Sequence, residues 1–453
     1  MEWTTGRAVR RGGAALAAVV LVALVVAGVS WCWPPSPAQE QARAILEARP
    51  QWPGSNAYAD LALLGVPGLT PGQRQARAEA HARQFERWYA DVYVPAFLQD
   101  RVPTAPPALV EADARAAFPD SGLCGFGAAA GCVAAVRRDP QATAAALAPH
   151  AVLLEQMDAL AAHGHFHSPL TQTEATPWPQ WQWLQVPLSA HALAHVQGDS
   201  ARALAGLCRD AGIGRMLMTQ GDGLVGVMAG GRLLQANAGL FAEVLAELPV
   251  DAPLPPGCTT AFALLSADEV GLCQGMRGEF AMQRRLATLT HRKIVQGRWY
   301  GRFFYSARKT LAGQAERLGQ VCLPEVRTAL AEDRRVPDMP LPAPSWWQPQ
   351  CLTNALGCTL NGIAAPAYLG FARRQQDVGA QVRLLQALLW LRGQAAQDAS
   401  VPVAQWLERL PAELRGRQRP LVVSADGGAL EVAAHGTPAV VLQMPLPQAM
   451  RGR

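Results

Sequence analysis

The sequence contains almost no lysine. Of its 40 basic residues only Lys293 and Lys309 are lysines, and 35 acidic residues leave a net charge of +5. The charge is spread along the chain without a basic stripe, which argues against nucleic-acid binding. The abundance of Arg and Ala is typical of a GC-rich bacterial genome. Because Ala favours helices, propensity alone would predict too much helix in this chain.

The sequence also lacks the short motifs of several enzyme classes. It contains no Gly-x-Ser-x-Gly elbow and no phosphate-binding loop. The glycine pairs at 212–214 and 221–223 are interpreted as helix ends. Glu279 and Arg277 lie close together in an apolar helical segment and are interpreted as a structural ion pair. We therefore expect no catalytic residue and no bound cofactor.

Only the N-terminal hydrophobic run is long enough to cross a membrane. Residues 224–248 are also apolar, but Arg, Asn and Glu interrupt them. Residues 12–39 carry no charge, and residues 14–30 are almost wholly Ala, Val and Leu. A helix of about 20 apolar residues crosses the roughly 30 Å hydrocarbon core of a bilayer. Residues 12–33 are therefore predicted to form a transmembrane signal anchor.

The charges around this segment predict its orientation. Arg7, Arg10 and Arg11 form a basic tail at residues 1–11, which should stay in the cytoplasm. Trp31 and Trp33 lie where an aromatic belt would mark the outer interface. We expect a single-pass protein of the bacterial inner membrane, with the bulk of the chain in the periplasm.

Cleavage and lipidation are the alternatives to a retained anchor. Ser36-Pro37-Ala38 fits the small-x-small cleavage pattern, but it lies far beyond the end of the apolar run. Val29-Ser30-Trp31 precedes Cys32, and a bulky Trp at that point is unlike a lipoprotein signal. The spacing favours retention.

Nine cysteines fit an exported protein. Cys32 belongs to the anchor segment, which leaves eight, an even number that predicts disulfides in an oxidising compartment. The short loops Cys124–Cys132 and Cys351–Cys358 are the favoured pairs, because both are flexible enough to reach bonding geometry. Cys258–Cys273 is a weaker alternative. Cys208 and Cys322 lie in helical patterns, where a buried free thiol is common.

Residues 34–335 are predicted to form a helical body. Capping boxes with Pro at the first helical position predict helix starts at Ser36 and Thr70. Asp139 opens a helix to Leu160, which Pro149 should kink or divide.

Three further helix starts follow in the same body. Ser189 is predicted to cap a helix through Val196, and Asp199 the next helix, through Arg209. A third capping box at 266–269 leads a helix to about Leu289. Residues 190–248 are similar to a tetratricopeptide-like α-hairpin, but the period is not sustained, so we expect no repeat array.

The amino-acid composition changes after residue 335. Five of the fifteen residues at 336–350 are Pro, which marks a linker or a crossover that follows the surface. Residues 351–453 are predicted to be a small α+β unit with a helix over 367–391. The list of expected strands is 420–424, 429–433 and 439–444, with a hairpin turn at 426–428. The predicted fold class is mainly α: a transmembrane helix, a helical-hairpin body and a C-terminal unit with a short antiparallel sheet.

Two resemblances concern the C-terminal half. Trp406-Leu407, Leu410-Pro411 and the strand-turn-strand pattern after them resemble the C-terminal half of pseudopilin-like proteins. The stretches 273–280 and 361–368 resemble an uncharacterised family of proteobacterial single-pass cell-envelope proteins. This resemblance implies an address and an architecture, and it brings no activity.

A histidine cluster is the sharpest candidate for chemistry. Six of the nine histidines lie between positions 150 and 195. His191 and His195 are four residues apart on one helix face, a spacing that zinc sites use. His163, His165 and His167 lie in a loop that could add a third ligand. The alternative is that the helical pair is partly buried and the loop histidines are solvated.

Three indoles at Trp178, Trp181 and Trp183 form a second feature. Interleaved with amides, they could stack on the sugar rings of a glycan. The alternative is that they fill the core or an interface and place their N–H groups on backbone acceptors. Trp346 and Trp347 allow the same two interpretations.

The expected function follows from the tether, the helical layers and the missing catalytic motifs. We expect a non-catalytic interaction or accessory protein of the cell envelope that works through a protein partner, as a scaffold, a secretion accessory or a toxin-neutralising protein. The alternative is a zinc-dependent envelope hydrolase that uses the His163–His195 cluster.

Overall fold

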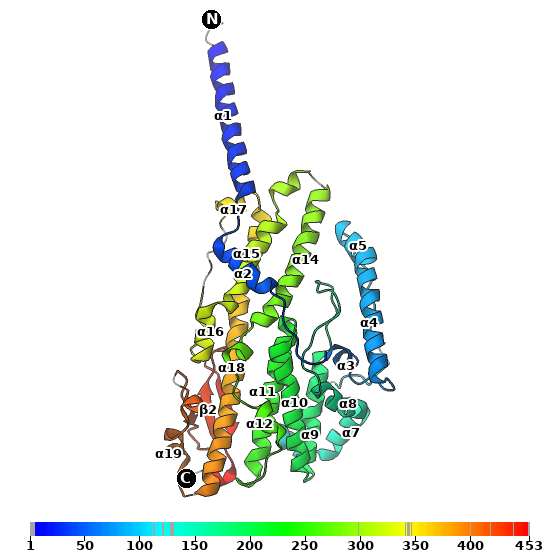
Figure 1. Cartoon of the computed structure of the whole chain (residues 1–453), viewed down its shortest axis with the longest axis vertical. Helices are drawn as coiled ribbons and strands as arrows, with labels where there is room; N and C mark the ends of the chain where they lie inside the picture. The colour runs from blue at the N-terminus through cyan, green and yellow to red at the C-terminus, as the bar shows by residue number, and fades with distance from the viewer. Residues whose placement is uncertain are drawn as a thin grey trace.

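The computed structural model describes residues 5–111, 114–119, 122–126, 131–297, 299–339, 341, 345, 347–398, 400–416, 418–437 and 439–451. This part of the chain is mainly helical, with one three-stranded sheet near its C-terminal end. The predicted fold class is confirmed. Figure 1 shows a long body of roughly parallel helices from which the first helix projects at one end.

The first helix, α1 (Thr5–Cys32), stands outside the body (Figure 1). Its large apolar side chains from Leu16 to Val29 are exposed, and an 18-residue window within Leu16–Glu47 has a mean hydropathy of 2.4. Pro34 and Pro35 follow the end of α1 and cannot continue its hydrogen-bond ladder. The N-terminal apolar helix is a candidate membrane span.

The next four helices in the chain follow α1. They are α2 (Pro37–Glu47), α3 (Tyr58–Ala62), α4 (Pro71–Trp88) and α5 (Val94–Leu98), with the π-helical turn η1 (Tyr89–Tyr93) before α5. The two predicted capping boxes are confirmed. Ser36 Oγ accepts the N–H of Gln39 at 3.2 Å, and Thr70 Oγ1 accepts the N–H of Gln73 at 3.3 Å.

A group of short helices comes next. They are α6 (Cys132–Arg138), α7 (Pro140–Leu147), η2 (Ala148–His150), α8 (Ala151–Ala161), η3 (Trp181–Gln185) and α9 (Val186–Val196). The helix that Asp139 opens is divided at Pro149, as predicted. The predicted cap at Ser189 is wrong. Helix α9 begins at Val186 because Pro187 suits the first turn, and Ser189 Oγ accepts the N–H of Cys124 at 2.7 Å instead.

Two long helices, α10 (Ser200–Gln220) and α11 (Leu224–Glu247), form the hairpin at the centre of the body. The prediction that residues 212–214 end a helix is wrong, since α10 continues to Gln220. Gly214 allows close packing instead: a Cβ added there would lie 2.7 Å from Leu234 N and 2.9 Å from Gly230 O. Residues 221–223 do separate the two helices, as predicted.

The next seven elements of the chain run toward the end of the body at α1 and then return from it. They are α12 (Gly257–Ala261), α13 (Ala267–Val270), α14 (Cys273–Gly297), η4 (Trp299–Phe303), α15 (Ala307–Gly319), η5 (Gln320–Cys322) and α16 (Pro324–Ala331). Ser266 caps a helix as predicted, but that helix ends at Val270, and α14 starts separately and passes Leu289. Helices α14 and α15 form a second hairpin, whose tip lies beside the base of α1 (Figure 1).

The C-terminal unit consists of one very long helix and a small sheet. Its elements are α17 (Pro349–Leu352), α18 (Ala355–Gln397), α19 (Val403–Glu408), α20 (Ala412–Arg415), β1 (Val422–Val423), β2 (Ala429–Ala433), β3 (Val441–Pro445) and η6 (Gln448–Met450). The strands are antiparallel in the order β1-β2-β3, with Leu430 opposite both Val423 and Met444. Buried Leu430, Val432 and Met444 hold the sheet to the rest of the core.

This unit shares one core with the helical body. Leu385 and Leu388 of α18 belong to the same buried cluster as Phe241 of α11. Helix α18 also has the length of a membrane span, and an 18-residue window in it has a mean hydropathy of 1.2, but it packs against α11 and α15. In the described part of 336–350, Val336 is buried and donates its N–H to Gln376 Oε1 at 2.9 Å. The start of this stretch is therefore held against α18.

Four disulfides cross-link the body. Cys124–Cys132 and Cys351–Cys358 form as predicted. The other two are Cys208–Cys258 and Cys273–Cys322, so the predicted pair Cys258–Cys273 and the free thiols at Cys208 and Cys322 are wrong. Helix packing decides these pairs, because α12 packs against α10 and the end of α15 lies beside the start of α14. The spacing of the cysteines in the sequence does not reveal these contacts.

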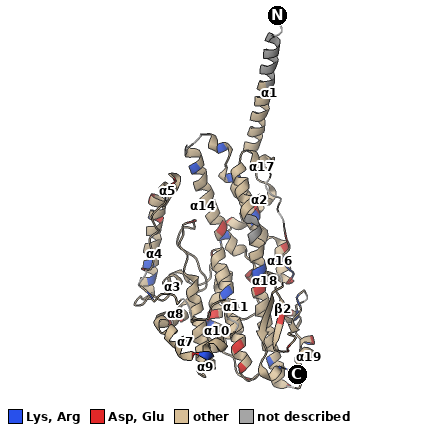
Figure 2. Ribbon diagram, turned by 180° about the vertical axis from the view of Figure 1, so that it is seen from behind, with Lys and Arg blue, Asp and Glu red and all other residues tan. Residues whose placement is uncertain are grey.

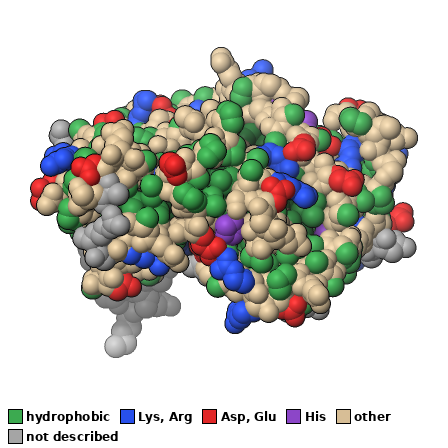
Figure 3. Space-filling view, turned by 90° about the horizontal axis from the view of Figure 1, so that it is seen from below, with side chains coloured by type: hydrophobic (Ala, Val, Ile, Leu, Met, Phe, Trp, Pro, Cys, Tyr) green, Lys and Arg blue, Asp and Glu red, His purple; other side chains and the backbone are tan. Residues whose placement is uncertain are grey.

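Charged side chains are scattered over the end of the body opposite α1. Figure 3 shows Lys and Arg interspersed with Asp and Glu among apolar side chains on this face. This mixture agrees with the sequence, in which the net charge is spread along the chain.

Candidate functional site

The five histidines predicted as metal ligands do not converge on one point, although the rings of His165 and His167 both stack on Trp52. Within the described residues, no group of three or more His, Cys, Asp or Glu side chains is placed to hold a metal ion. His165 Nδ1 bonds to Pro53 O at 2.8 Å, and His167 Nδ1 lies 3.2 Å from an Asp222 oxygen. The three convergent ligands that zinc requires are not assembled here.

His163 bonds to a hydroxyl and a carboxylate. Its Nδ1 lies 2.8 Å from Ser55 Oγ and its Nε2 lies 2.7 Å from Asp60 Oδ2. The hydrogen bond to His163 lowers the pKa of Asp60. Hydroxyl, imidazole and carboxylate in series are the components of nucleophilic catalysis. However, the nearby N–H groups of Gly164 and Ala57 donate to backbone carbonyls, so neither is free to hold an oxyanion. The series ties the loop at His163 to Ser55 and to Asp60 of α3.

His195 is bonded on both ring nitrogens. Its Nδ1 lies 2.8 Å from Ser200 Oγ and its Nε2 lies 2.9 Å from Glu247 Oε2. Glu247 in turn accepts hydrogen bonds from Arg137, which lower the pKa of the carboxyl more than any other contact does. An imidazole with both nitrogens engaged has no lone pair left for a metal.

His191 differs because it lines a cavity. Its Nε2 lies 2.7 Å from Asp210 Oδ2, and Asp210 is almost fully buried and also paired with Arg209 at 2.7 Å. The cavity has a volume of about 500 Å³ and is lined by Glu155, Asp158, Arg202 and Arg209 besides His191. The buried carboxylate fixes the orientation of the imidazole, which packs directly against Gly206.

This packing gives a prediction for Gly206→Ala. The added Cβ would lie 2.2 Å from His191 Cε1 and 2.5 Å from Nδ1, so we expect the ring to be displaced and the free energy of unfolding to fall by about 1–3 kcal/mol. Gly212→Ala, on the same helix with open space around its Cβ, should stabilise by about 0.5–1 kcal/mol. Chemical denaturation of both variants checks this, and equal effects would contradict it.

The three indoles take part in packing. Trp181 packs edge-on against Phe166 at 5.2 Å between ring centroids. Trp183 is buried and donates its Nε1–H to Gln180 at 2.7 Å. Trp178 is half-buried and lies over Gly223. Core packing is thus the observed role, and contact with a glycan stays a prediction. Trp346 lies outside the described residues.

Glu279 and Arg277 do not pair with each other, which corrects the sequence expectation. Arg277 donates to Ile45 O and to Gln274 Oε1. Burial raises the pKa of Glu279, whose carboxyl accepts the backbone N–H of Leu224. Since Gly223 gives α11 no side-chain cap, Glu279 supplies an acceptor at the start of that helix.

A buried polar cluster joins α1 to the body. Ser30, near the end of α1, is completely buried. Its Oγ donates to Pro349 O at 2.5 Å and accepts the N–H of Thr353 at 3.1 Å. Thr353 Oγ1 also lies 2.8 Å from Ser30 Oγ. One serine of the apolar helix thus bonds to both ends of the short helix α17.

Lys309 completes this junction. Its Nζ donates to Ser30 O, to Thr353 Oγ1 at 2.7 Å and, more weakly, to Ser30 Oγ at 3.4 Å. Desolvation, together with neighbouring Arg308, lowers the pKa of Lys309 to about 8. The compact ammonium has three donors for three acceptors, a match that the planar fork of an arginine does not offer. Cations also interact favourably with a helix C-terminus.

Arg308 extends the same cap. Its guanidinium donates to Trp31 O and Trp33 O, both at 3.3 Å. Two consecutive basic residues of α15 therefore satisfy carbonyl groups at the end of α1, which have no partner within the helix. The end of the apolar helix is held by the body rather than by a free linker.

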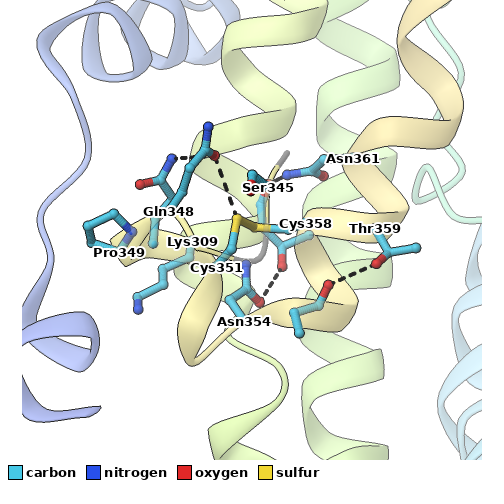
Figure 4. Close-up of a disulfide and its surroundings, with 12 residues drawn as sticks. Lys309, Ser345, Gln348, Pro349, Cys351, Asn354, Cys358, Thr359 and Asn361 are labelled. Atoms are coloured by element: carbon cyan, nitrogen blue, oxygen red, sulfur yellow. Dashed lines mark hydrogen bonds between the residues drawn. A yellow bond between two sulfur atoms is a disulfide. The ribbon is translucent and has the colours of Figure 1, made fainter. Parts of the chain in front are cut away.

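Figure 4 shows the surroundings of Lys309 and the disulfide Cys351–Cys358. The disulfide joins α17 to the start of α18 and so fixes the turn that carries Thr353. Beside it lies a cavity of about 180 Å³, lined by Trp33, Gln39, Glu316 and Asn361 among others. This volume accommodates a few water molecules.

Ser30, Lys309 and Thr353 carry no motif. Their only signal in the sequence is the rarity of lysine, since one of the two lysines in an arginine-rich chain is the residue that caps α1.

Comparisons with protein-family models, with curated proteins and with solved structures find no match for the chain. The resemblance of 273–280 and 361–368 to an envelope family therefore stays a prediction.

Proposed function

We propose that this chain is a single-pass protein of the bacterial inner membrane whose periplasmic body acts through a protein partner rather than by catalysis. The observation that carries the proposal is the junction of Ser30 with Lys309 and Thr353. Cleavage after Ala38 would remove Ser30, and with it two of the three acceptors of the buried Lys309 ammonium, Ser30 O and Ser30 Oγ. The junction therefore supports a retained anchor.

The arrangement of the body supports an interaction role. The candidate metal-binding histidines are individually engaged, and one continuous hydrophobic core joins the helices of the body. A rigid body held in a fixed orientation to a membrane suits a scaffold or an accessory subunit of an envelope assembly. The base of α1 then sets how the partner-binding surfaces are presented.

Topology is tested first. Alkaline phosphatase fused to the C-terminus should be active, alkaline carbonate should not extract the protein, and the intact mass of the purified chain should include residues 1–38. An inactive phosphatase fusion would contradict the periplasmic address. A mature mass that starts after Ala38 would contradict the retained anchor.

The interaction role is tested by photocrosslinking in cells. A photoreactive amino acid is placed at Val225, Leu254 or Val441, three exposed apolar positions of the body. The proposal expects one defined protein adduct that recurs at neighbouring positions and is lost when the position is moved into the core. Adducts with abundant porins alone, at every position, would contradict it.

A further inference from the structure

We propose that the tip of the α14–α15 hairpin, with the adjoining start of α18, inserts into the headgroup region of the membrane next to α1 and binds anionic phospholipid. This contact is distinct from the transmembrane anchor, although it rests on the proposed function because it needs α1 to span the bilayer. It would give the body a second point of attachment and so fix its tilt.

The position of the tip follows from contacts with α1. The rings of Trp31 and Phe303 lie 5.9 Å apart between centroids, so η4 touches the last turn of the apolar helix. The N–H of Leu356 donates to Phe304 O at 3.1 Å, which places the start of α18 against the same tip. Figure 1 shows both elements at the end of the body from which α1 leaves.

The length of α1 places this level at the membrane boundary. The uncharged helical residues 12–32 extend about 32 Å at 1.5 Å per residue, close to the roughly 30 Å of a hydrocarbon core. The outer boundary therefore lies near Trp31. Since Phe303 contacts Trp31, the tip cannot be far from the lipid headgroups.

The side chains at this level are apolar and exposed. Tyr300 is 42% exposed, Phe303 36%, Phe304 56%, Leu352 37% and Leu356 43%. Exposed apolar side chains that gather in one place mark a contact surface, and aromatic residues are enriched where a protein meets the membrane interface. In this setting the natural occupant is the bilayer into which α1 runs.

The charge of the hairpin points to anionic lipid. Residues 280–315 contain eight basic residues and no acidic one; the eight are Arg284, Arg285, Arg292, Lys293, Arg298, Arg302, Arg308 and Lys309. Figure 2 shows basic residues toward the end of this hairpin that lies near α1. Some already have partners: Lys293 pairs with Asp100 and Arg308 caps α1. Arg292 and Arg302 are exposed and are the residues best placed to meet phosphate groups.

The test uses the full chain reconstituted in vesicles of phosphatidylglycerol and phosphatidylethanolamine. A photoreactive phenylalanine analogue replaces Phe304, and mass spectrometry detects lipid adducts after irradiation. The matched control carries the analogue at Val422, which is 49% exposed on β1 in the C-terminal sheet, away from α1. We expect lipid adducts at 304 severalfold above those at 422. Equal yields, or adducts only with protein at 304, would overturn the inference.

The charge is tested separately with Arg292→Gln/Arg302→Gln. This variant should lose adducts at 304 severalfold in vesicles with phosphatidylglycerol and should change little in vesicles of phosphatidylcholine alone. Arg327→Gln/Arg334→Gln, at exposed arginines elsewhere on the body, is the control. Identical yields for both variants would overturn the anionic-lipid assignment. Extraction by carbonate reports on the anchor itself, so a protein that stays in the membrane without adducts at 304 refutes only this inference.

Discussion

Lys309→Glu is expected to release α1 from the body. The substitution places a carboxylate against Ser30 O and the negative end of the α1 dipole, and it removes all three donors from buried acceptors. Arg308 cannot easily compensate, because it already bonds to Trp31 O and Trp33 O. An uncompensated buried charge costs about 3–5 kcal/mol, and we expect the free energy of docking to fall by that amount.

Hydrogen exchange measures this effect locally. The backbone N–H of Thr353 donates to Ser30 Oγ, so its protection depends on docking. A loss of 3 kcal/mol or more should raise its exchange rate by at least about a hundredfold, at 1.4 kcal/mol per factor of ten. Limited proteolysis should then cut between α1 and α2.

The only other lysine provides the control. Lys293 has a partly exposed side chain and forms a surface ion pair with Asp100. Lys293→Glu breaks that pair at a cost of about 1 kcal/mol or less and should leave Thr353 protected. If both variants exchange alike at Thr353, Lys309 has no special role at the junction.

The parts of the fold that the sequence predicts are those governed by local chemistry. Ser36, Thr70 and Ser266 cap helices because each supplies an oxygen to a backbone N–H three residues later. The hairpin at Asp426 forms in the predicted place, where its carboxylate accepts the N–H of Gly428 at 3.0 Å. Each of these signals is complete within a few residues.

The errors occur where a partner far away in the sequence decides the outcome. Gly214 ends no helix, because Gly230 and Leu234 of α11 require a residue without a Cβ there. Ser189 caps no helix, because its hydroxyl serves the loop at Cys124. Propensity ranks a residue by its neighbours in sequence, whereas these two positions are selected by packing across elements.

The junction could not be predicted for the same reason. Ser30 reads as one small residue in an apolar run, and Lys309 as one cation in a basic helix; 279 positions separate them. The histidine spacing, by contrast, gave a specific hypothesis that the structure does not assemble. Helix spacing aligns two side chains, but only the tertiary fold decides whether they share a partner, and here His191 bonds to Asp210 whereas His195 bonds to Glu247.

Removing the Cys208–Cys258 disulfide is expected to have the other large effect. This bond closes a loop of 50 residues between α10 and α12, against a loop of 8 residues for Cys124–Cys132. In the loop-entropy account the longer loop contributes about 4 kcal/mol and the shorter about 2.5 kcal/mol, because the longer loop restricts the unfolded chain more. Both sulfur pairs lie in the buried core, so packing losses should be similar.

The comparison between two double variants isolates the loop term. Cys208→Ala/Cys258→Ala should lower the free energy of unfolding by roughly 1.5 kcal/mol more than Cys124→Ala/Cys132→Ala does, as measured by denaturant unfolding of the detergent-solubilised chain. Cys32→Ala, at the exposed free cysteine, should change stability little, so it is the control for a Cys→Ala substitution that breaks no disulfide. The reverse order of the two double variants would mean that native packing around α10, rather than the unfolded chain, determines what each bond contributes. A third outcome is that both double variants lose the same free energy relative to the oxidised wild type and none relative to the reduced wild type. Both disulfides would then stabilise the folded protein, but loop length would not explain how much each contributes.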